Sequence, residues 1–256
     1  MTLAAVQVAS HHAWYRSFAS AGSEIATFGS AQAILTTARP ERSLLNAVAY
    51  EDPRDVPLHE LDAFFEPVEA WCVWVQPGHD ELAQVCEARG MTVDGTPMLM
   101  AAEMAEVDLA PRDVPAEIAG GTWNDMGVIN DAAYGLPEEH FAPVMRRLST
   151  EAYRLAVARR DGSGLACAGV LIDGANAEVV FVATLPDARR QGLAAECMRA
   201  ALRAAAKDGC TTTTLEATSA GEPVYAGMGY RSFGRYRMME ARRSGDPRVA
   251  NRAGSL

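Results

Sequence analysis

The sequence predicts an α/β fold of the α+β type. Its second half is expected to form a mixed, mostly antiparallel sheet flanked by helices, and its first half a smaller α/β domain. Two turn signals, Asp161-Gly162-Ser163-Gly164 and Asp173-Gly174, separate three apolar runs and predict an antiparallel meander. Further on, one long helical segment lies between two strands, which predicts a single helical crossover between parallel neighbours.

The elements of the second half follow from hydrophobic periodicity between turn residues. A short edge strand and two helices come first, and Pro137 lies at the start of the second helix, a position that proline favours. In order, the predicted elements are a strand over 116–118, helices over 122–134 and 138–148, strands over 153–158, 165–172 and 177–184, a helix over 192–208, a strand over 211–217, a helix over 222–228 and a strand over 231–240.

The first half has weaker signals and ends in a linker over 107–115, which holds two prolines and mixed charges. Its predicted elements are helices over 6–21, 58–65 and 80–89 and strands over 44–50, 71–75 and 98–104. We therefore expect an N-terminal domain over 1–107, a second domain over 112–240 and a polar tail over 241–256.

The composition argues against several classes of protein. A net charge of −10 disfavours non-specific nucleic-acid binding, which needs a basic face. Residues 1–110 hold five arginines against sixteen acidic residues, which indicates a solvated acidic surface or, alternatively, an attraction for a cationic substrate. Five scattered cysteines predict reduced thiols, and five histidines without ligand spacing predict no metal site.

The chain also lacks membrane signals. No stretch approaches the ~18 apolar residues needed to cross a bilayer. The N-terminal segment has no basic region followed by an apolar one, so it does not read as a signal peptide. We expect a cytoplasmic protein without a membrane or nucleic-acid partner.

A strand–turn–helix segment over 179–194 gives the strongest functional signal. An apolar β-branched run stops at Pro186-Asp187, crosses Arg189 and Arg190, and enters an alanine-rich helix after Gly192. Such a turn directs unpaired backbone N–H groups and the positive end of the helix dipole at one point. Because phosphate is the usual occupant, the segment predicts binding of a phosphate-bearing cofactor.

Arg189, Gly192 and Ala194 fill the pattern Arg/Gln-x-x-Gly-x-Gly/Ala, and Tyr225 is followed four and five residues on by glycine and an aromatic residue. With the element order, these signatures resemble the GNAT superfamily of N-acetyltransferases over residues 112–240. The resemblance implies acetyl-CoA as cosubstrate and direct attack on its thioester by the primary amine of a small-molecule acceptor. Homodimers are common in the family, so the resemblance allows for one here.

The resemblance also implies roles for individual residues. Tyr225 would be the catalytic acid that protonates the departing thiolate, and the N–H of Val182 would polarise the thioester carbonyl. Cofactor-binding residues would be Val182, Ala183, Thr184, Arg189, Arg190, Gln191, Gly192, Leu193 and Ala194. The asparagine that often precedes the tyrosine in the family is absent here.

Two questions stay open at this point. Glu178 and Glu216 lie on the strands that would flank the cleft, but we favour solvated strand residues for both, with a water chain as the alternative base. A non-catalytic acyl-CoA-binding sensor or interaction protein, which keeps the anion site without turnover, is the rival to an acyltransferase.

The first half resembles a degenerate copy of the same fold. The strand over 71–75, the turn at Pro77-Gly78, the helix over 80–89 and Gly90 repeat the order strand, turn, helix, glycine. The turn lacks the glycine pattern and carries acidic residues that repel phosphate. We therefore predict no second acetyl-CoA site.

Overall fold

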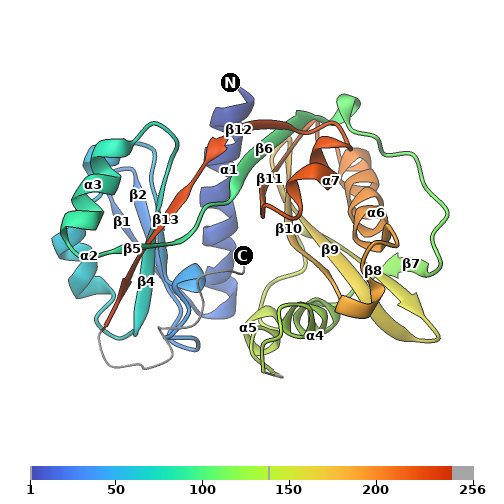
Figure 1. The fold of residues 1–256 in the computed structure, drawn as a ribbon, viewed down its shortest axis with the longest axis horizontal. Helices are drawn as coiled ribbons and strands as arrows, with labels where there is room; N and C mark the ends of the chain where they lie inside the picture. Colours follow the sequence, from blue (N-terminus) through green and yellow to red (C-terminus); the bar gives the residue numbers. More distant parts are fainter. Residues whose placement is uncertain (1, 138, 244–256) are drawn as a thin grey trace.

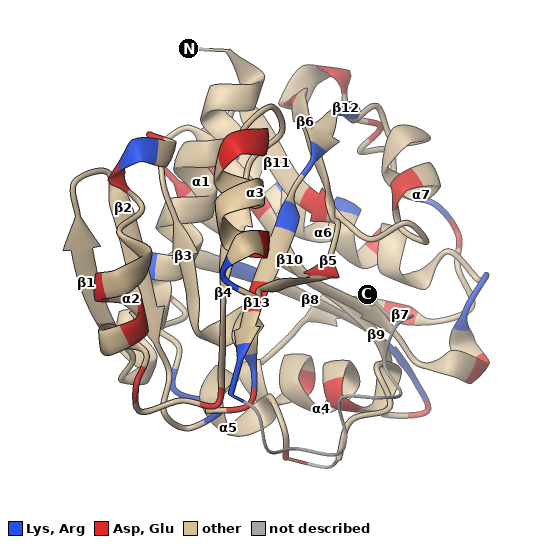
Figure 2. Cartoon of the chain, turned by 60° about the vertical axis from the view of Figure 1, so that its left-hand side comes forward, with Lys and Arg blue, Asp and Glu red and all other residues tan. Residues whose placement is uncertain are grey.

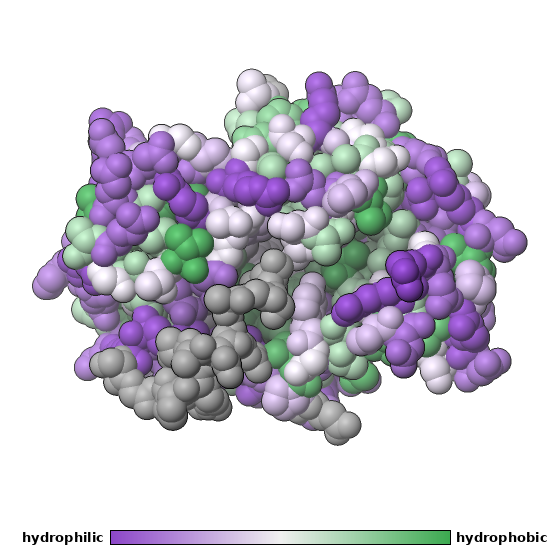
Figure 3. Space-filling view, in the orientation of Figure 1, coloured by the Kyte–Doolittle hydropathy of each residue, from purple (hydrophilic) through white to green (hydrophobic). Residues whose placement is uncertain are grey.

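The computed structural model describes residues 2–137 and 139–243. Two sheets lie side by side with one helix between them (Figure 1). Both sheets are mixed and mostly antiparallel, so the predicted α+β fold is confirmed. On the face shown in Figure 3, hydrophilic residues gather toward the outer parts and hydrophobic ones lie between them. Among the described residues, every helix is too short or too polar to cross a bilayer.

The first sheet has six strands, and only its β3–β4 pair is parallel. In spatial order they are β1 (Glu24–Phe28), β2 (Ala31–Leu35), β3 (Ala47–Ala49), β4 (Ala70–Val75), β13 (Arg237–Arg242) and β5 (Thr92–Gly95). Helix α2 (Leu58–Phe64) connects the two parallel strands, and α3 (Asp80–Ala88) connects β4 to β5.

The second sheet has seven strands, and only its β10–β11 pair is parallel. In spatial order they are β12 (Arg231–Arg235), β6 (Met98–Glu103), β11 (Thr212–Ala217), β10 (Asn176–Thr184), β9 (Ser163–Asp173), β8 (Tyr153–Arg160) and β7 (Glu117–Gly120). Helix α6 (Leu193–Lys207) is the predicted crossover between the parallel pair, and it packs its apolar face on this sheet.

The two halves exchange strands. β6 comes from the first half but pairs in the second sheet, and β13 comes from the second half but pairs in the first. The single strand predicted over 231–240 is therefore wrong. The pairing of β12 with β6 is irregular around Gly234, which has φ +111°, and Tyr236 separates β12 from β13. The sheets therefore do not follow the predicted domain limits at residues 107 and 112, because each sheet contains one strand from the other half.

Helix α1 (Leu3–Ser17) lies between the sheets and contacts β2 on one side and β6, β10 and β11 on the other (Figure 1). Its buried side chains include Gln7, Ser10 and His11 as well as Trp14 and Tyr15. A 3₁₀ turn over Phe18–Ala21 follows it. Because a hydrophobic cluster around Trp14 joins both sheets, one core extends through the two halves.

Three further helices cover the second sheet. α4 (Trp123–Ala133) begins at a capping box of Thr122 and Asp125, and α7 (Glu222–Ala226) follows β11. α5 spans only Ala142–Met145, much less than the predicted 138–148. The carboxylate of Asp131 accepts hydrogen bonds from the backbone of residues 140 to 142, which holds His140 and Phe141 outside the helix.

The strand predicted over 44–50 is also shorter in the structure. A 3₁₀ turn at Ser43–Leu45 precedes β3. The reason is Asn46, whose amide accepts from Thr36 N–H at 2.7 Å and donates to the Arg39 and Arg42 carbonyls at 2.9 Å. These side-chain bonds compete with the ladder of a strand.

Candidate functional site

Several backbone N–H groups at the start of α6 have no hydrogen-bond partner among the described residues. β10 ends at Thr184, a 3₁₀ turn spans Pro186–Ala188, and Gly192 is the N-cap residue of α6. Within the described part of the chain, no group accepts a hydrogen bond from the N–H of any residue from 190 to 194. We call these five N–H groups the amide cradle. Their number and the helix dipole make the cradle fit a phosphate or diphosphate group.

The cradle depends on two left-handed backbone conformations, φ +63° at Arg190 and φ +75° at Gly192. A Cβ built on Gly192 would meet only Val114, at 3.7 Å, which is ordinary contact. Backbone conformation, rather than lack of room in the protein, therefore accounts for glycine here.

The two arginines of the turn do different things. Arg189 donates to the carbonyl oxygens of Ala133 at 2.9 Å and Thr184 at 3.5 Å, so its guanidinium binds protein backbone. Arg190 is exposed and makes no hydrogen bond or ion pair with any described residue. Gln191 accepts from Arg160 at 2.7 Å. Arg190 is thus the side chain that remains available to an anion in the cradle.

Strands β10 and β11 diverge after their fourth pair, Val179 with Leu215. The pairing of β10 with β9 shifts between Val180 and Ala183, and Phe181 within this bulge has φ +53°. Ala183 and Thr184 pair with β9 on one edge, and residues 182–184 have no β11 partner on the other among the described residues. An open edge of this kind can pair with an extended ligand.

Tyr225 lies on α7, beyond the point where the strands diverge. Its ring lies 6.3 Å from that of Tyr230, and a Cβ on Gly221 would lie 2.8 Å from it, so the ring occupies space that glycine leaves. Its hydroxyl has no hydrogen-bond partner among the described residues. Burial, with a smaller effect of the nearby Tyr134, raises the pKa of Tyr225 well above its usual range.

Glu178 and Glu216 are not solvated strand residues, contrary to the sequence-based interpretation. Glu178 is fully buried, and the side chain of Glu216 is 12% exposed. Both side chains face α1. Their strand neighbours Val179 and Leu215 point to the opposite face of the sheet and pack against α6, since side chains alternate along a strand. Their polar partners are Gln7, Ser10 and His11 of α1. We call Glu178 and Glu216 the carboxylate pair.

One oxygen of each carboxylate in the pair has a hydrogen-bond partner on α1, whereas one oxygen of Glu178 has none among the described residues. Ser10 donates to Glu178 Oε2 at 2.7 Å, His11 Nδ1 lies 2.9 Å from Glu216 Oε1, and Gln7 donates to the same Glu216 oxygen. Glu178 Oε1 has no partner among the described residues. Burial and the Glu216 charge raise the pKa of Glu178 well above its usual range, so this carboxylate has a greater affinity for a proton than a solvated one.

Comparison with known protein families agrees with this geometry. Residues 123–230 match the sequence model of the acetyltransferase (GNAT) family. The C-terminal region is a GNAT-family domain. A search of curated protein sequences finds no match.

Solved structures extend the likeness beyond the GNAT domain. A GCN5-related N-acetyltransferase from Kribbella flavida superposes with a TM-score of 0.65 at 19% identity, covering 94% of this chain and 96% of that one. A second such protein, from Sphaerobacter thermophilus, gives 0.60 at 17% identity, covering 85% and 78%. A tandem GNAT protein of the clavulanic acid biosynthesis pathway gives 0.58 at 14% identity, covering 84% and 79%. The shared fold therefore includes the first half.

The first half repeats the crossover of the GNAT domain, but at a different place from the one that the sequence suggested. The counterpart of β10–α6–β11 is β3–α2–β4, the only parallel pair of the first sheet, and not β4 followed by α3. The turn before α2 spans 50–57 and holds Asp52 and Asp55, and acidic residues also lie on α2 and α3 (Figure 2).

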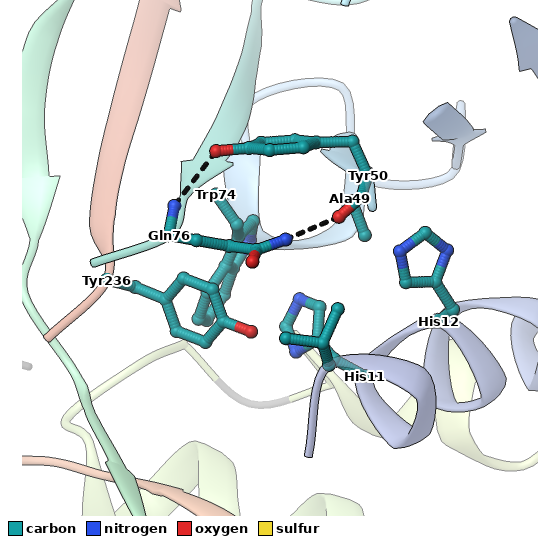
Figure 4. A pocket seen from close by; sticks show the side chains of 8 residues that line it. His11, His12, Ala49, Tyr50, Trp74, Gln76 and Tyr236 are labelled. Carbon is teal, nitrogen blue, oxygen red and sulfur yellow. Dashed lines mark hydrogen bonds between the residues drawn. The ribbon is translucent and has the colours of Figure 1, made fainter. Parts of the chain in front are cut away.

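Protein side chains fill the gap between β3 and β4. The Tyr50 hydroxyl accepts from Gln76 N–H at 3.0 Å, and the Gln76 amide donates to the Tyr50 carbonyl (Figure 4). The crevice that remains, bordered also by His11, Trp74 and Tyr236, is too narrow to hold a water molecule. That the first half has no second acetyl-CoA site stays a prediction.

Proposed function

We propose that this protein is an acetyl-CoA-dependent N-acetyltransferase whose acceptor is a small primary amine. Two features carry the proposal. The amide cradle at Gly192 follows β10, and the unpartnered hydroxyl of Tyr225 lies on α7 after β11, so the two follow the two strands that diverge. The match to the family supports acyl transfer in general, and these two features support acetyl-CoA as the donor and a tyrosine as the acid.

The cofactor would be held at three places. The N–H groups of Arg190, Gln191, Gly192, Leu193 and Ala194 would bind the diphosphate of acetyl-CoA, each charge-assisted bond contributing ~1.5–3 kcal/mol. The Arg190 guanidinium would add a charged contact. The open backbone edge of Val182, Ala183 and Thr184 would pair with the amides of the pantetheine arm, as an added strand does.

The transfer then needs one acid and one base. The neutral amine attacks the thioester carbon, the C–S bond breaks, and the Tyr225 phenol donates its proton to the departing thiolate. The N–H of Val182 would stabilise the negative charge on the carbonyl oxygen before that bond breaks. The amine loses two protons in all, one to a base before attack and one that restores the phenol. Glu178, Glu216 or water would be that base.

The test is release of free thiol from acetyl-CoA in the presence of a panel of small amines, with Tyr225→Phe as the comparison. Turnover of at least one amine, reduced in the variant, supports an acetyltransferase. Calorimetric binding of coenzyme A without turnover of any amine would favour the acyl-CoA-binding sensor instead. Absence of coenzyme A binding by the folded protein would contradict both functions.

A further inference from the structure

Helix α1 belongs to the first half of the chain, yet it supplies most polar partners of the carboxylate pair. Gln7, Ser10 and His11 have the i, i+3, i+4 spacing that places side chains on one helix face. Gln7 and His11 contact Glu216, and Ser10 donates to Glu178. All three α1 side chains are buried. The family match begins only at residue 123, so α1 lies outside it.

The carboxylate pair lies at the point where β10 and β11 begin to diverge. Glu178 comes one residue before the last β10–β11 pair, and Glu216 is the first β11 residue beyond it. The pair therefore flanks the start of the divergence that the proposed function assigns to the thioester. It also faces the side of the sheet opposite to α6, so that cofactor phosphates and carboxylates do not compete for one space.

We infer that α1 completes the GNAT active site: Gln7, Ser10 and His11 position Glu178 and Glu216 as the pair that takes the proton from the acceptor amine. The inference rests on the proposed function. The ammonium loses one proton to a carboxylate oxygen, which gives a neutral amine and a carboxylic acid, and no other bond changes. Glu178 Oε1, which has no other partner, is the free oxygen of the pair.

His11 acts as a positioning residue in this scheme. The scheme requires His11 Nδ1 to carry the proton shared with Glu216, because an ionised carboxylate only accepts hydrogen bonds. A donor to a carboxylate favours its ionised form, and loss of the donor raises the proton affinity of the pair. Other titratable groups that face the pair or His11 are Tyr15, Tyr153, Asp173, Tyr236 and His12.

The experiment is an NMR titration of the full chain carrying ¹³C-labelled glutamate, with Glu178→Gln and Glu216→Gln identifying the two signals. His11→Leu removes the donor, whereas His11→Asn keeps an N–H near the position of Nδ1. His12→Leu is the matched control, since His12 is equally buried on the same helix but shows no contact with either carboxylate. Ser10→Ala provides a second loss of a donor if His11→Leu does not fold.

We expect the titration midpoint of the pair to rise by about one pH unit in His11→Leu, to return toward wild type in His11→Asn, and to stay unchanged in His12→Leu. The acidic limb of kcat/KM for any amine that is acetylated should shift in step. A purely structural role of His11 would lower activity and melting temperature without moving either midpoint, and that result would overturn the inference.

Two other results are informative. His11, Glu178 and Glu216 have ligand atoms within 4.8 Å of one another, so a divalent cation is the rival occupant. Stoichiometric zinc binding that is lost in Glu178→Gln would overturn the inference, because the pair would then hold a metal ion in place of a proton. If wild type acetylates no amine while the midpoints move as expected, the proposed function fails and the positioning of the pair by α1 still holds.

Discussion

The guanidinium of Arg189 donates a 2.9 Å hydrogen bond to the carbonyl oxygen of Ala133, the last residue of α4. This bond joins the turn that carries the amide cradle to the helix on the opposite side of the sheet. Arginine at the first position of the family pattern therefore fixes the loop in this protein, and the next arginine faces solvent. The two side chains should respond differently to substitution.

Arg190→Ala is expected to weaken acetyl-CoA binding by about tenfold, because one exposed charged contact to phosphate is lost. Its melting temperature should stay within a degree or two of wild type. Arg189→Ala should instead lower the melting temperature, since two backbone carbonyls lose their donor. Isothermal calorimetry and thermal unfolding of both variants measure the difference, and equal losses of stability would contradict the assignment.

Gly192→Ala should weaken acetyl-CoA binding through the backbone. A left-handed conformation costs an alanine about 1–2 kcal/mol, and relaxing it would turn the cradle N–H groups away from one another. Gly135→Ala is the matched control, because Gly135 has φ +63°, open space around it and no part in the cradle. We expect similar losses of stability in the two variants and a several-fold loss of coenzyme A affinity in Gly192→Ala alone.

The cofactor site could be predicted from sequence because it is local. The strand, turn and helix over 176–207 obey short-range rules: β-branched residues, a Pro-Asp turn, glycine at a left-handed position and a helix with one apolar face. The sequence could not show which of Arg189 and Arg190 binds protein and which stays available to the cofactor. Which of two adjacent guanidinium groups turns toward protein depends on Ala133, which is distant in sequence.

The sequence placed Glu178 and Glu216 at the cleft, but the burial of this carboxylate pair and its partners on α1 could not be predicted, because these parts come together only in the tertiary structure. His11 and Glu216 are 205 residues apart, and no spacing rule links them. Hydrophobic periodicity also could not predict the exchange of β6 and β13, because it shows that a segment is a strand but not with which strands it pairs. β1, β2 and β5 were missed as well; β5 is mostly exposed and has no apolar face.

Tyr225→Phe should reduce kcat by about 10²-fold or more with little change in KM, as expected for loss of a general acid. Tyr134→Phe is the control, because Tyr134 is the neighbouring phenol and an alternative proton donor. Burial raises the pKa of Tyr225, so its phenol stays protonated at least to its ordinary value of about 10. The pH profile of kcat should therefore show no basic limb from this residue below about pH 10; a larger loss in Tyr134→Phe would reassign the acid.

The exchanged strands should make the two halves unfold together. Removal of β13 from the first sheet separates β4 from β5, and loss of β6 separates β11 from β12, so neither half keeps a complete sheet alone. Native-state hydrogen exchange should then give β4 and β10 the same opening free energy, equal to the global value. A lower value for β4 would mean that the first half opens independently.

A substitution at Tyr236 tests in a second way whether the two halves unfold together. It lies at the crossover into β13, is 1% exposed, and donates to Gln7 of α1 at 3.1 Å. Tyr236→Ala should cost about 3–5 kcal/mol, as truncation of a large buried aromatic does, and should lower protection in β4 and β10 equally. Val85→Ala, on the exposed side of α3, should change protection in both strands by less than about 0.5 kcal/mol. Loss of protection in the first sheet alone would show that the exchanged strand does not couple the two halves.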